Sequence, residues 1–169
     1  MGIDVIEDEM ESGLIDSEAN IGPLRNYIGF HLRRAQDVSF QAFSRRVDSS
    51  DLNAGHFTIL AIIQENPGLN QTALSLATGR DKSTLTPALK GLEAQGYVAR
   101  TRSTTDRRAY HLGLTSEGES YLARLKVHAL AHDKLLDEIV GDFHKPLLIH
   151  LLERIVEGLG KPEINGDDD

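Results

Sequence analysis

The sequence predicts a mainly α-helical protein that carries one small β-hairpin. Apolar residues recur at intervals of three and four over most of the chain, as they do on one face of a helix. The exceptions are two β-prone segments, 97–102 and 109–114, which a polar and basic loop separates. Directly before them, a glycine-containing turn at 78–80 joins two short predicted helices. Helix, turn, helix and hairpin in this order are typical of a winged helix-turn-helix domain, here with longer helices on both sides.

The N-terminal region is expected to contain a mobile acidic arm followed by a helix. Residues 1–20 carry seven carboxylates and no Lys or Arg, and they lack a sustained apolar period. This composition is typical of a segment that does not fold alone. Pro23 suits the first turn of a helix, and helical spacing continues from there to about Val47. We therefore expect one helix over 21–47.

Asn70 and Asp81 are placed to cap the two helices that flank the turn, because short polar side chains accept hydrogen bonds from the free amides of a helix start. The first helix would reach about Ala77, and Gly79 can take the left-handed conformation that ends a helix. The second would reach about Gln95, with two contrasting faces. One face is apolar (Leu85, Ala88, Leu89 and Leu92) and the other is mainly polar (Ser83, Thr86, Pro87 and Lys90).

Three further helix starts are expected from capping residues. Asn53 would cap a short helix before the helix-turn-helix, and Thr115 a long helix that ends at Gly141. Asp142 would cap the last helix, in which residues 148–159 form a wide apolar stripe.

The net charge of −8 is unevenly distributed along the chain. The two ends are acidic, whereas residues 78–112 contain seven basic residues against three acidic ones. Salt screens exposed charges beyond roughly 10 Å, so a nearby phosphate would experience the local basic field. The acidic composition therefore does not argue against a nucleic acid partner.

Several function classes are disfavoured by what the sequence lacks. With no Cys there are no disulfides or thiolate zinc sites. No apolar run is long enough for a membrane span, and the acidic N-terminus is unlike a signal peptide, so we expect a cytoplasmic protein with no membrane partner. No catalytic triad, paired carboxylates, P-loop or dinucleotide fingerprint stands out. We expect neither an enzyme nor a cofactor.

Four motifs, in this order and spacing, resemble the MarR family of bacterial regulators. They are Asp-Lys-Ser-Thr-Leu-Thr at 81–86, Leu-Glu-Ala-Gln-Gly-Tyr-Val at 92–98, Thr-Asp-Arg-Arg-Ala at 105–109 and Leu-Thr-Ser-Glu-Gly at 114–118. One such motif alone would be weak, but four in order are a strong signal. The resemblance covers about residues 22–159.

The resemblance implies a homodimer in which the first and the last two helices intertwine, and in which two winged domains reach double-stranded DNA. It also implies repression that a small molecule relieves. It divides the chain into an acidic arm (1–20), an N-terminal dimerisation helix (21–47), a winged helix-turn-helix domain (53–115), C-terminal dimerisation helices (116–160) and an acidic tail (161–169).

DNA contacts are expected from the second helix of the helix-turn-helix. Ser83, Thr84, Thr86 and Lys90 would project into the major groove, where hydroxyls and an ammonium can reach phosphates and base edges. Pro87, inside this helix, removes one backbone hydrogen bond and could kink it. Arg100 and Arg102, on the first strand, would contact phosphates or remain ordinary surface residues. An ordinary solvated helix face is the alternative for this whole set.

The loop between the strands carries Asp106, Arg107 and Arg108, which match the family's wing motif. In the family the acid orients the second Arg, and a wing Arg enters the minor groove, whose narrow form concentrates negative potential. A surface ion pair of little energetic value is the alternative.

A ligand pocket is expected from the resemblance alone, between the dimerisation helices and the winged domain. Its candidate residues are Phe30, His31, Arg34, Phe40 and Phe57. By family analogy the effector would be an aromatic acid or its coenzyme A thioester, although a Phe at helical spacing is more often a core residue.

His128 and His132 stand four residues apart, a spacing that can chelate a metal, and some members of the family sense zinc. Without Cys, solvated or hydrogen-bonded histidines are the favoured interpretation, and no metal site is assigned. The remaining alternatives to a ligand-released repressor are a metal-responsive regulator using these histidines and a winged-helix module that binds proteins but not DNA.

Overall fold

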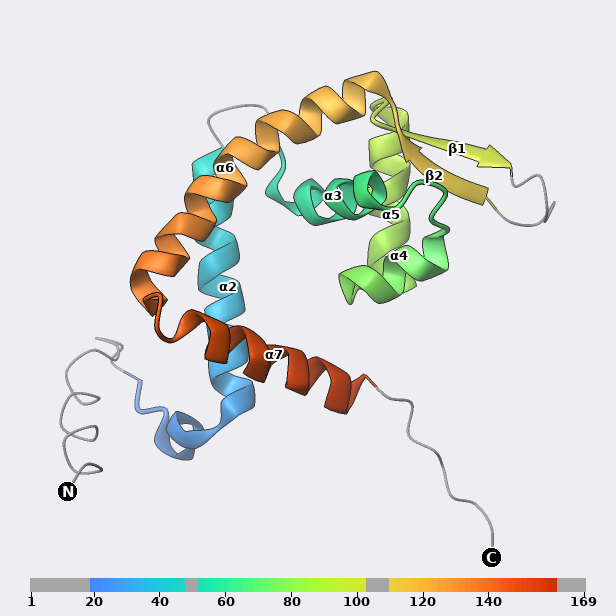
Figure 1. Ribbon diagram of the computed structural model, residues 1–169. Coiled ribbons are helices and arrows are strands. Elements are labelled where there is room, and N and C mark those ends of the chain that lie inside the picture. The colour runs from blue at the N-terminus through green and yellow to red at the C-terminus, as the bar shows by residue number, and fades with distance from the viewer. Residues whose placement is uncertain (1–18, 48–51, 103–109, 161–169) are drawn as a thin grey trace, which may run out of the picture. The chain divides into compact units, whose positions relative to one another are not determined.

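The computed structural model describes residues 19–47, 52–102 and 110–160. These residues fall into two compact units, with the boundary between Ser39 and Phe40. The fold is mainly helical with one two-stranded antiparallel hairpin, as the sequence predicts (Figure 1).

The first unit contains a short 3-10 helix, η1 (Gly22–Asn26), and the greater part of α2 (Ile28–Val47). Pro23 lies at the start of η1, but the prediction of one continuous helix from Pro23 is wrong. Tyr27 takes an extended conformation between η1 and α2, and its amide donates to the carbonyl of Leu24 at 3.0 Å. This bond closes η1, so that α2 begins anew at Ile28.

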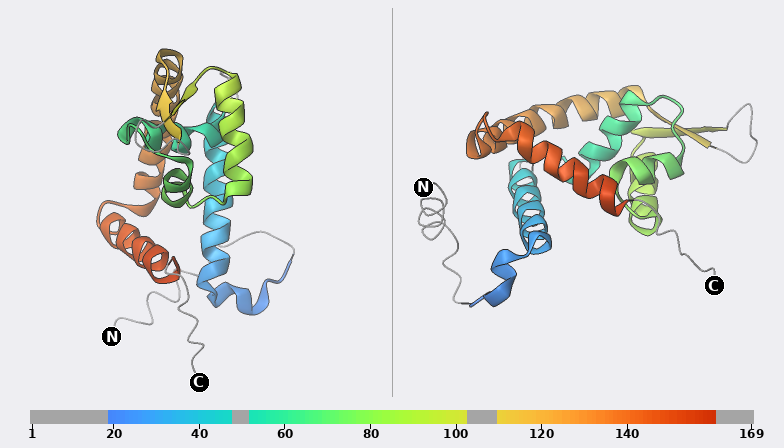
Figure 2. Two further views of the ribbon diagram at one scale, coloured as in Figure 1. Left: turned by 90° about the vertical axis from the view of Figure 1, so that its right-hand side faces the viewer. Right: turned by 60° about the horizontal axis from the view of Figure 1, so that its bottom comes forward.

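The second unit contains the winged helix-turn-helix and two further helices. In chain order its elements are the end of α2, then η3 (Ala54–His56), α3 (Phe57–Glu65), α4 (Gln71–Thr78), α5 (Lys82–Ala94), β1 (Val98–Arg102), β2 (Tyr110–Leu114), α6 (Ser116–Val140) and α7 (Lys145–Leu159). The hairpin projects from the helices of this unit in Figure 1 and in the right-hand view of Figure 2.

The predicted caps of the central helices are confirmed. Side-chain oxygens of Asn70, Asp81 and Thr115 accept from the amides of Ala73, Thr84 and Gly118, at 2.9, 2.7 and 3.0 Å respectively. Gly79 ends α4 in the left-handed conformation with φ 64°. Asn53 accepts from Gly55, but the element it begins is the short η3, and α3 starts only at Phe57.

The predicted start of the last helix at Asp142 is wrong. After Gly141, whose φ is 77°, the amides of His144 and Lys145 both donate to the Gly141 carbonyl at 3.1 Å. Asp142 therefore lies inside this turn, and α7 begins at Lys145 without a side-chain cap. The Lys145 ammonium lies 2.6 Å from the Asp137 carboxylate at the end of α6, and this ion pair spans the turn.

The core of the second unit forms around the apolar face of α5. Leu85, Leu89 and Leu92 are fully buried, and Leu74 of α4 and Leu112 of β2 belong to the same cluster. The cluster also contains fully buried residues of α3 and α6, namely Ile59, Leu60, Leu122 and Leu125. Each such side chain contributes about 1.5–3 kcal/mol of burial free energy. The apolar face predicted for α5 is therefore confirmed.

The hairpin pairs Val98 with Leu114 at its base and Arg102 with Tyr110 at its far end. The Leu112 amide donates to the carbonyl of Leu69 at 2.8 Å, which attaches β2 to the segment that precedes α4. In β2, Leu112 is buried, whereas Tyr110 is 41% exposed.

Gly118, in the first turn of α6, marks the closest approach of a helix to the hairpin base. It is buried, and a Cβ there would overlap the backbone carbonyl of Tyr97. The Thr115 amide donates to the same carbonyl at 3.1 Å, so that oxygen is held in place and cannot move away.

Gly118→Ala should therefore lower the free energy of unfolding by about 2 kcal/mol, in the range found for overpacked cores. Gly91→Ala is the matched control, because Gly91 lies inside α5 with open space around it. That substitution should raise the free energy of unfolding by roughly 0.5–1 kcal/mol. Urea denaturation measures both, and equal effects of the two substitutions would contradict the close approach.

Candidate nucleic-acid interface

The outer face of α5 carries the residues that the sequence predicts as groove contacts. Ser83, Thr84 and Lys90 are exposed, and Thr86 is half-buried. The three exposed residues lie away from the buried leucines of the same helix, whose burial keeps this face turned outward. Pro87 is exposed, and α5 continues through it to Ala94.

Asp81 organises the start of α5. Its Oδ1 accepts from the Ser83 hydroxyl at 2.5 Å and from the Thr84 amide at 2.7 Å, while Oδ2 accepts from the Thr84 hydroxyl at 3.2 Å. These bonds, the one from the Ser83 hydroxyl first, lower the pKa of the Asp81 carboxyl. The two hydroxyl protons are thus engaged, and Ser83 and Thr84 present oxygen lone pairs outward.

Thr86 is engaged on both sides of its hydroxyl. Oγ1 donates to the carbonyl of Lys82 at 2.7 Å and accepts from Nε2 of Gln71 at 2.8 Å. A hydroxyl has a single proton, so Thr86 has none to offer a base. Among the four predicted groove residues, Lys90 remains the exposed cation.

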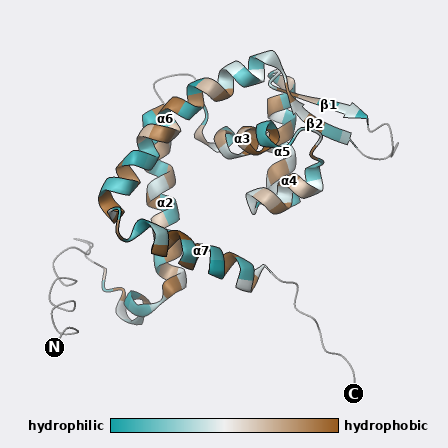
Figure 3. Cartoon of the chain, in the orientation of Figure 1, coloured by the Kyte–Doolittle hydropathy of each residue, from teal (hydrophilic) through white to brown (hydrophobic). Residues whose placement is uncertain are grey.

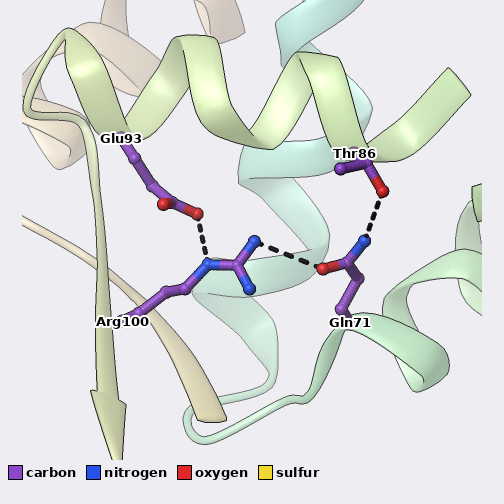
Figure 4. A network of polar contacts seen from close by, with 4 residues as sticks. All are labelled: Gln71, Thr86, Glu93 and Arg100. Carbon is purple, nitrogen blue, oxygen red and sulfur yellow. Dashed lines mark hydrogen bonds and ion pairs between the residues drawn. The ribbon is translucent and has the colours of Figure 1, made fainter. Parts of the chain in front are cut away.

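The two arginines of β1 are in different environments. Arg102 is exposed near the far end of the hairpin. Arg100 is half-buried, with Nε 2.5 Å from Glu93 Oε1 and Nη2 3.2 Å from Gln71 Oε1 (Figure 4). Gln71 and Glu93 were not predicted as parts of the site, because their hydrogen bonds to Arg100 depend on how α4, α5 and β1 pack.

The predicted wing residues Asp106, Arg107 and Arg108 lie outside the described residues. Their roles stay predictions. Arg102 and Tyr110, the described residues on either side of them, pair with each other.

The candidate ligand residues are divided between the two units. In the first, the Arg34 guanidinium lies 5.6 Å from the centroid of the Phe30 ring, and His31 Nε2 lies 2.7 Å from the carbonyl oxygen of Arg25. The Phe30 and His31 rings also meet edge to face at 5.5 Å. These three residues are therefore neighbours on one stretch of α2.

In the second unit, Phe40 is 44% exposed, whereas Phe57 packs against the core and meets the Phe43 ring edge to face at 5.9 Å. Phe57 thus has a structural role in the core, which is the alternative interpretation of this residue.

The two histidines of α6 differ in exposure. His132 is buried and stacks on Phe43 with a centroid distance of 5.5 Å, whereas His128 is half-buried. Within the described ranges, no group of three or more His, Asp or Glu side chains is arranged to hold a metal ion.

Many exposed apolar side chains lie on the C-terminal half of α6, on α7 and on the turn between them, where brown residues alternate with teal ones in Figure 3. We call this set the C-terminal apolar surface; its members are Val127, Leu130, Leu135, Ile139, Phe143, Leu147, Leu148, Ile149, Leu151, Leu152, Val156 and Leu159. None of the helices that the structure describes is both long and apolar enough to cross a bilayer. Exposed apolar surfaces of this extent mark contacts with other proteins.

Comparison with known proteins agrees with this architecture. The sequence profile of the MarR family matches residues 52–110. A putative transcriptional regulatory protein for the hcr operon of Thauera aromatica is 35% identical over 135 residues, which make up 79% of this chain and 81% of that protein. The chain belongs to the MarR family of transcriptional regulators.

Solved structures extend the likeness beyond residues 52–110. The transcriptional repressor CouR bound to a 23-mer DNA duplex shares 35% identity, with a TM-score of 0.73 over 83% of this MarR-family chain and 99% of that chain. CouR bound to p-coumaroyl-CoA shares 32% identity, with a TM-score of 0.73 over 82% and 98% of the two chains. CouR from Rhodococcus jostii RHA1 bound to the same compound shares 26% identity, with a TM-score of 0.69 over 82% and 95%.

The Asp81 cap makes a pH-dependent contribution to the stability of this MarR-family winged domain. The pKa of Asp81 is lower in the folded protein than that of an ordinary aspartate, chiefly because of the hydrogen bond from the Ser83 hydroxyl, so the unfolded chain binds the proton more readily. The contribution is fully present above the unfolded pKa and is lost as the pH falls through the lower folded pKa. Asp81→Asn keeps an acceptor for the Thr84 amide but cannot titrate. The melting temperature of the wild type should therefore exceed that of Asp81→Asn at pH 7, and the two should converge below pH about 4.

Glu65→Gln, an exposed carboxylate outside any cap, is the control for that comparison. If the difference in melting temperature between wild type and Asp81→Asn is the same at every pH, the cap makes no such contribution.

Proposed function

We propose that this MarR-family regulator is a ligand-released, DNA-binding repressor that reads the major groove with the outer face of α5. The observation that carries the proposal is the two-faced character of that helix. Its leucines are fully buried, while Ser83, Thr84 and Lys90 are exposed on the opposite face. The similarity to CouR, which has been solved on a DNA duplex, supports it.

The polar groups of this face suit both functions that DNA contacts serve. Lys82, Lys90 and Arg102 are exposed cations on α5 and β1, and cations of this kind supply the salt-dependent attraction to phosphates. The lone pairs of Ser83 and Thr84, at the start of the helix, are positioned to accept from base amino groups, such as N4 of cytosine. Sequence preference would then come from the first turn of α5. We propose minor-groove contact by Arg107 or Arg108 on the same family analogy.

The C-terminal apolar surface supports a homodimer, because a second copy of the chain offers an equally apolar face to cover it. A two-fold dimer would present two α5 helices to DNA. The operator would then be a near-palindrome with half-sites about one helical turn, roughly 34 Å, apart. We propose that the regulator acts in the cytoplasm and catalyses no reaction.

For the effector we propose an aromatic acid or its coenzyme A thioester. The similarity to CouR, solved with p-coumaroyl-CoA, supports this class. In this chain, Phe30 supplies an aromatic ring and Arg34 a guanidinium beside it, which suit an aromatic ring and a carboxylate or phosphate. A coupling of about 1–3 kcal/mol between ligand and DNA would be enough to release the operator.

Lys90→Gln should weaken binding to the DNA upstream of the protein's own gene and reduce the slope of log affinity against log salt by about 1. Lys134→Gln is the matched control, because Lys134 is also exposed but lies on α6, 3.9 Å from Glu138. Fluorescence anisotropy over a salt series measures both. Wild-type protein that shows no salt-dependent binding to any such DNA would instead favour the protein-binding module.

An aromatic acyl-CoA such as p-coumaroyl-CoA should raise the melting temperature of the protein and release it from DNA. Free coenzyme A should do neither. Arg34→Gln should reduce the thermal shift. The control is Arg33→Gln at the neighbouring position, which removes the exposed ion pair of Arg33 with Asp37 and should leave the thermal shift unchanged. Thermal-shift measurements with a panel of such compounds test this proposal. If none of the compounds stabilises the protein, this effector class is ruled out.

A further inference from the structure

We propose that Arg100 is a positioning residue, which fixes the groove-facing helix α5 against α4 and the wing strand β1, and that it does not contact phosphate. This inference rests on the proposed DNA-binding function. It changes the role that the sequence suggests for Arg100, and it adds Gln71 and Glu93 to the machinery of DNA recognition.

The four side chains form one continuous chain of hydrogen bonds across three elements (Figure 4). From β1, Arg100 bonds to Glu93 near the end of α5 and to Gln71 at the start of α4. Gln71 then donates to Thr86 in the middle of α5. The chain therefore holds α5 at two points about two turns apart, residues 86 and 93, from a single guanidinium on the wing strand.

The direction of these bonds is fixed by chemistry. Arg100 has only donors, so the amide oxygen of Gln71 must face it and the amide nitrogen must face Thr86. Thr86 then accepts from Gln71 and must direct its own proton elsewhere, to the Lys82 carbonyl at 2.7 Å. Donors thus point the same way from Arg100 to the first turn of α5, and hydrogen bonds in such a series strengthen one another.

Burial separates Arg100 from the exposed cations of the interface. The side chains of Arg100 and Glu93 are 28% and 29% exposed, and the Glu93 carboxylate neutralises the guanidinium at 2.5 Å. Turning Arg100 toward a phosphate would leave Glu93 without this cation and Gln71 without its donor. A half-buried ion left in that state is costly. Arg102, two residues along the same strand and exposed, is in the position that suits a phosphate contact.

The two roles for Arg100 predict opposite effects of neutralising its partner. If Arg100 positions α5, Glu93→Gln should weaken operator binding about ten-fold, as loss of a charged hydrogen bond would. If Arg100 contacts phosphate, removing the competing carboxylate should strengthen binding.

Arg100→Gln should also weaken operator binding about ten-fold while leaving the salt slope and the affinity for unrelated DNA unchanged. The matched control Arg102→Gln should lower the salt slope by about 1.

Two more variants separate positioning from loss of fold. Arg100→Lys keeps the ion pair with Glu93 but cannot reach both partners with a rigid fork, so it should restore part of the operator affinity. Gln71→Ala leaves the ion pair between Arg100 and Glu93 intact and removes the hydrogen bonds of Gln71 to Arg100 and to Thr86, and it should lower operator affinity at an unchanged salt slope. The double variant Glu93→Gln/Arg100→Gln should be no weaker than Arg100→Gln alone, because both residues act through one network.

Tighter operator binding by Glu93→Gln, or a salt slope lowered by Arg100→Gln, would overturn the positioning role while leaving the DNA-binding function standing. Wild-type protein that binds no DNA would overturn the proposed function itself. Circular dichroism melting of each variant shows that the protein compared is folded, and unchanged affinity for unrelated DNA provides the same control in the binding assay.

Discussion

The burial of one leucine face of α5 is the constraint on which the rest of the winged domain depends. Leu85, Leu89 and Leu92 have no exposed surface and pack in one cluster with residues of α3, α4, β2 and α6. Rotating the helix about its axis would expose them, at roughly 1.5–3 kcal/mol for each side chain. The opposite face is therefore held outward, and the residues on it are available to a partner.

Apolar packing fixes which face is buried, but it is weakly directional along the helix axis. The polar chain from Arg100 to Thr86 supplies direction, because each of its hydrogen bonds requires a particular donor and acceptor at a particular distance. The close approach of Gly118 to the Tyr97 carbonyl fixes the base of the hairpin in a similar way. Together, the buried leucines, the hydrogen bonds from Arg100 to Thr86 and the close packing of Gly118 hold α5 and β1 in one fixed arrangement.

The sequence predicted best those features that depend on neighbouring residues. The caps at Asn70, Asp81 and Thr115 and the left-handed Gly79 each involve residues two to four positions apart, so that local pattern was sufficient. The start of α7 was predicted wrongly because Asp142 is, as a residue type, as good a helix cap as Asn70, Asp81 or Thr115. Only the turn that follows Gly141 moves the start to Lys145.

The site was predicted in part for the same physical reason. The outward face of α5 follows from helical periodicity, and its exposure agrees with that prediction. The partners of Arg100 come from positions 7 and 29 residues earlier in the chain, and no local pattern brings them together. A basic residue on a strand near DNA-facing elements resembles a phosphate contact until its neighbours are known. Likewise, Phe57 belongs to the core because of its packing against Phe43, a contact between separate helices.

The central claim is that the first turn of α5 lies in the major groove, and proximity-directed cleavage tests it most directly. The chain has no Cys, so Ser83→Cys creates a single attachment point for a DNA-cleaving iron chelate, and Glu138→Cys, on α6, is the control. The labelled Ser83→Cys protein should cut its operator at two positions about one helical turn apart, and the Glu138→Cys protein should not. Equal or absent cleavage by the two proteins, on DNA that both still bind, would contradict the account.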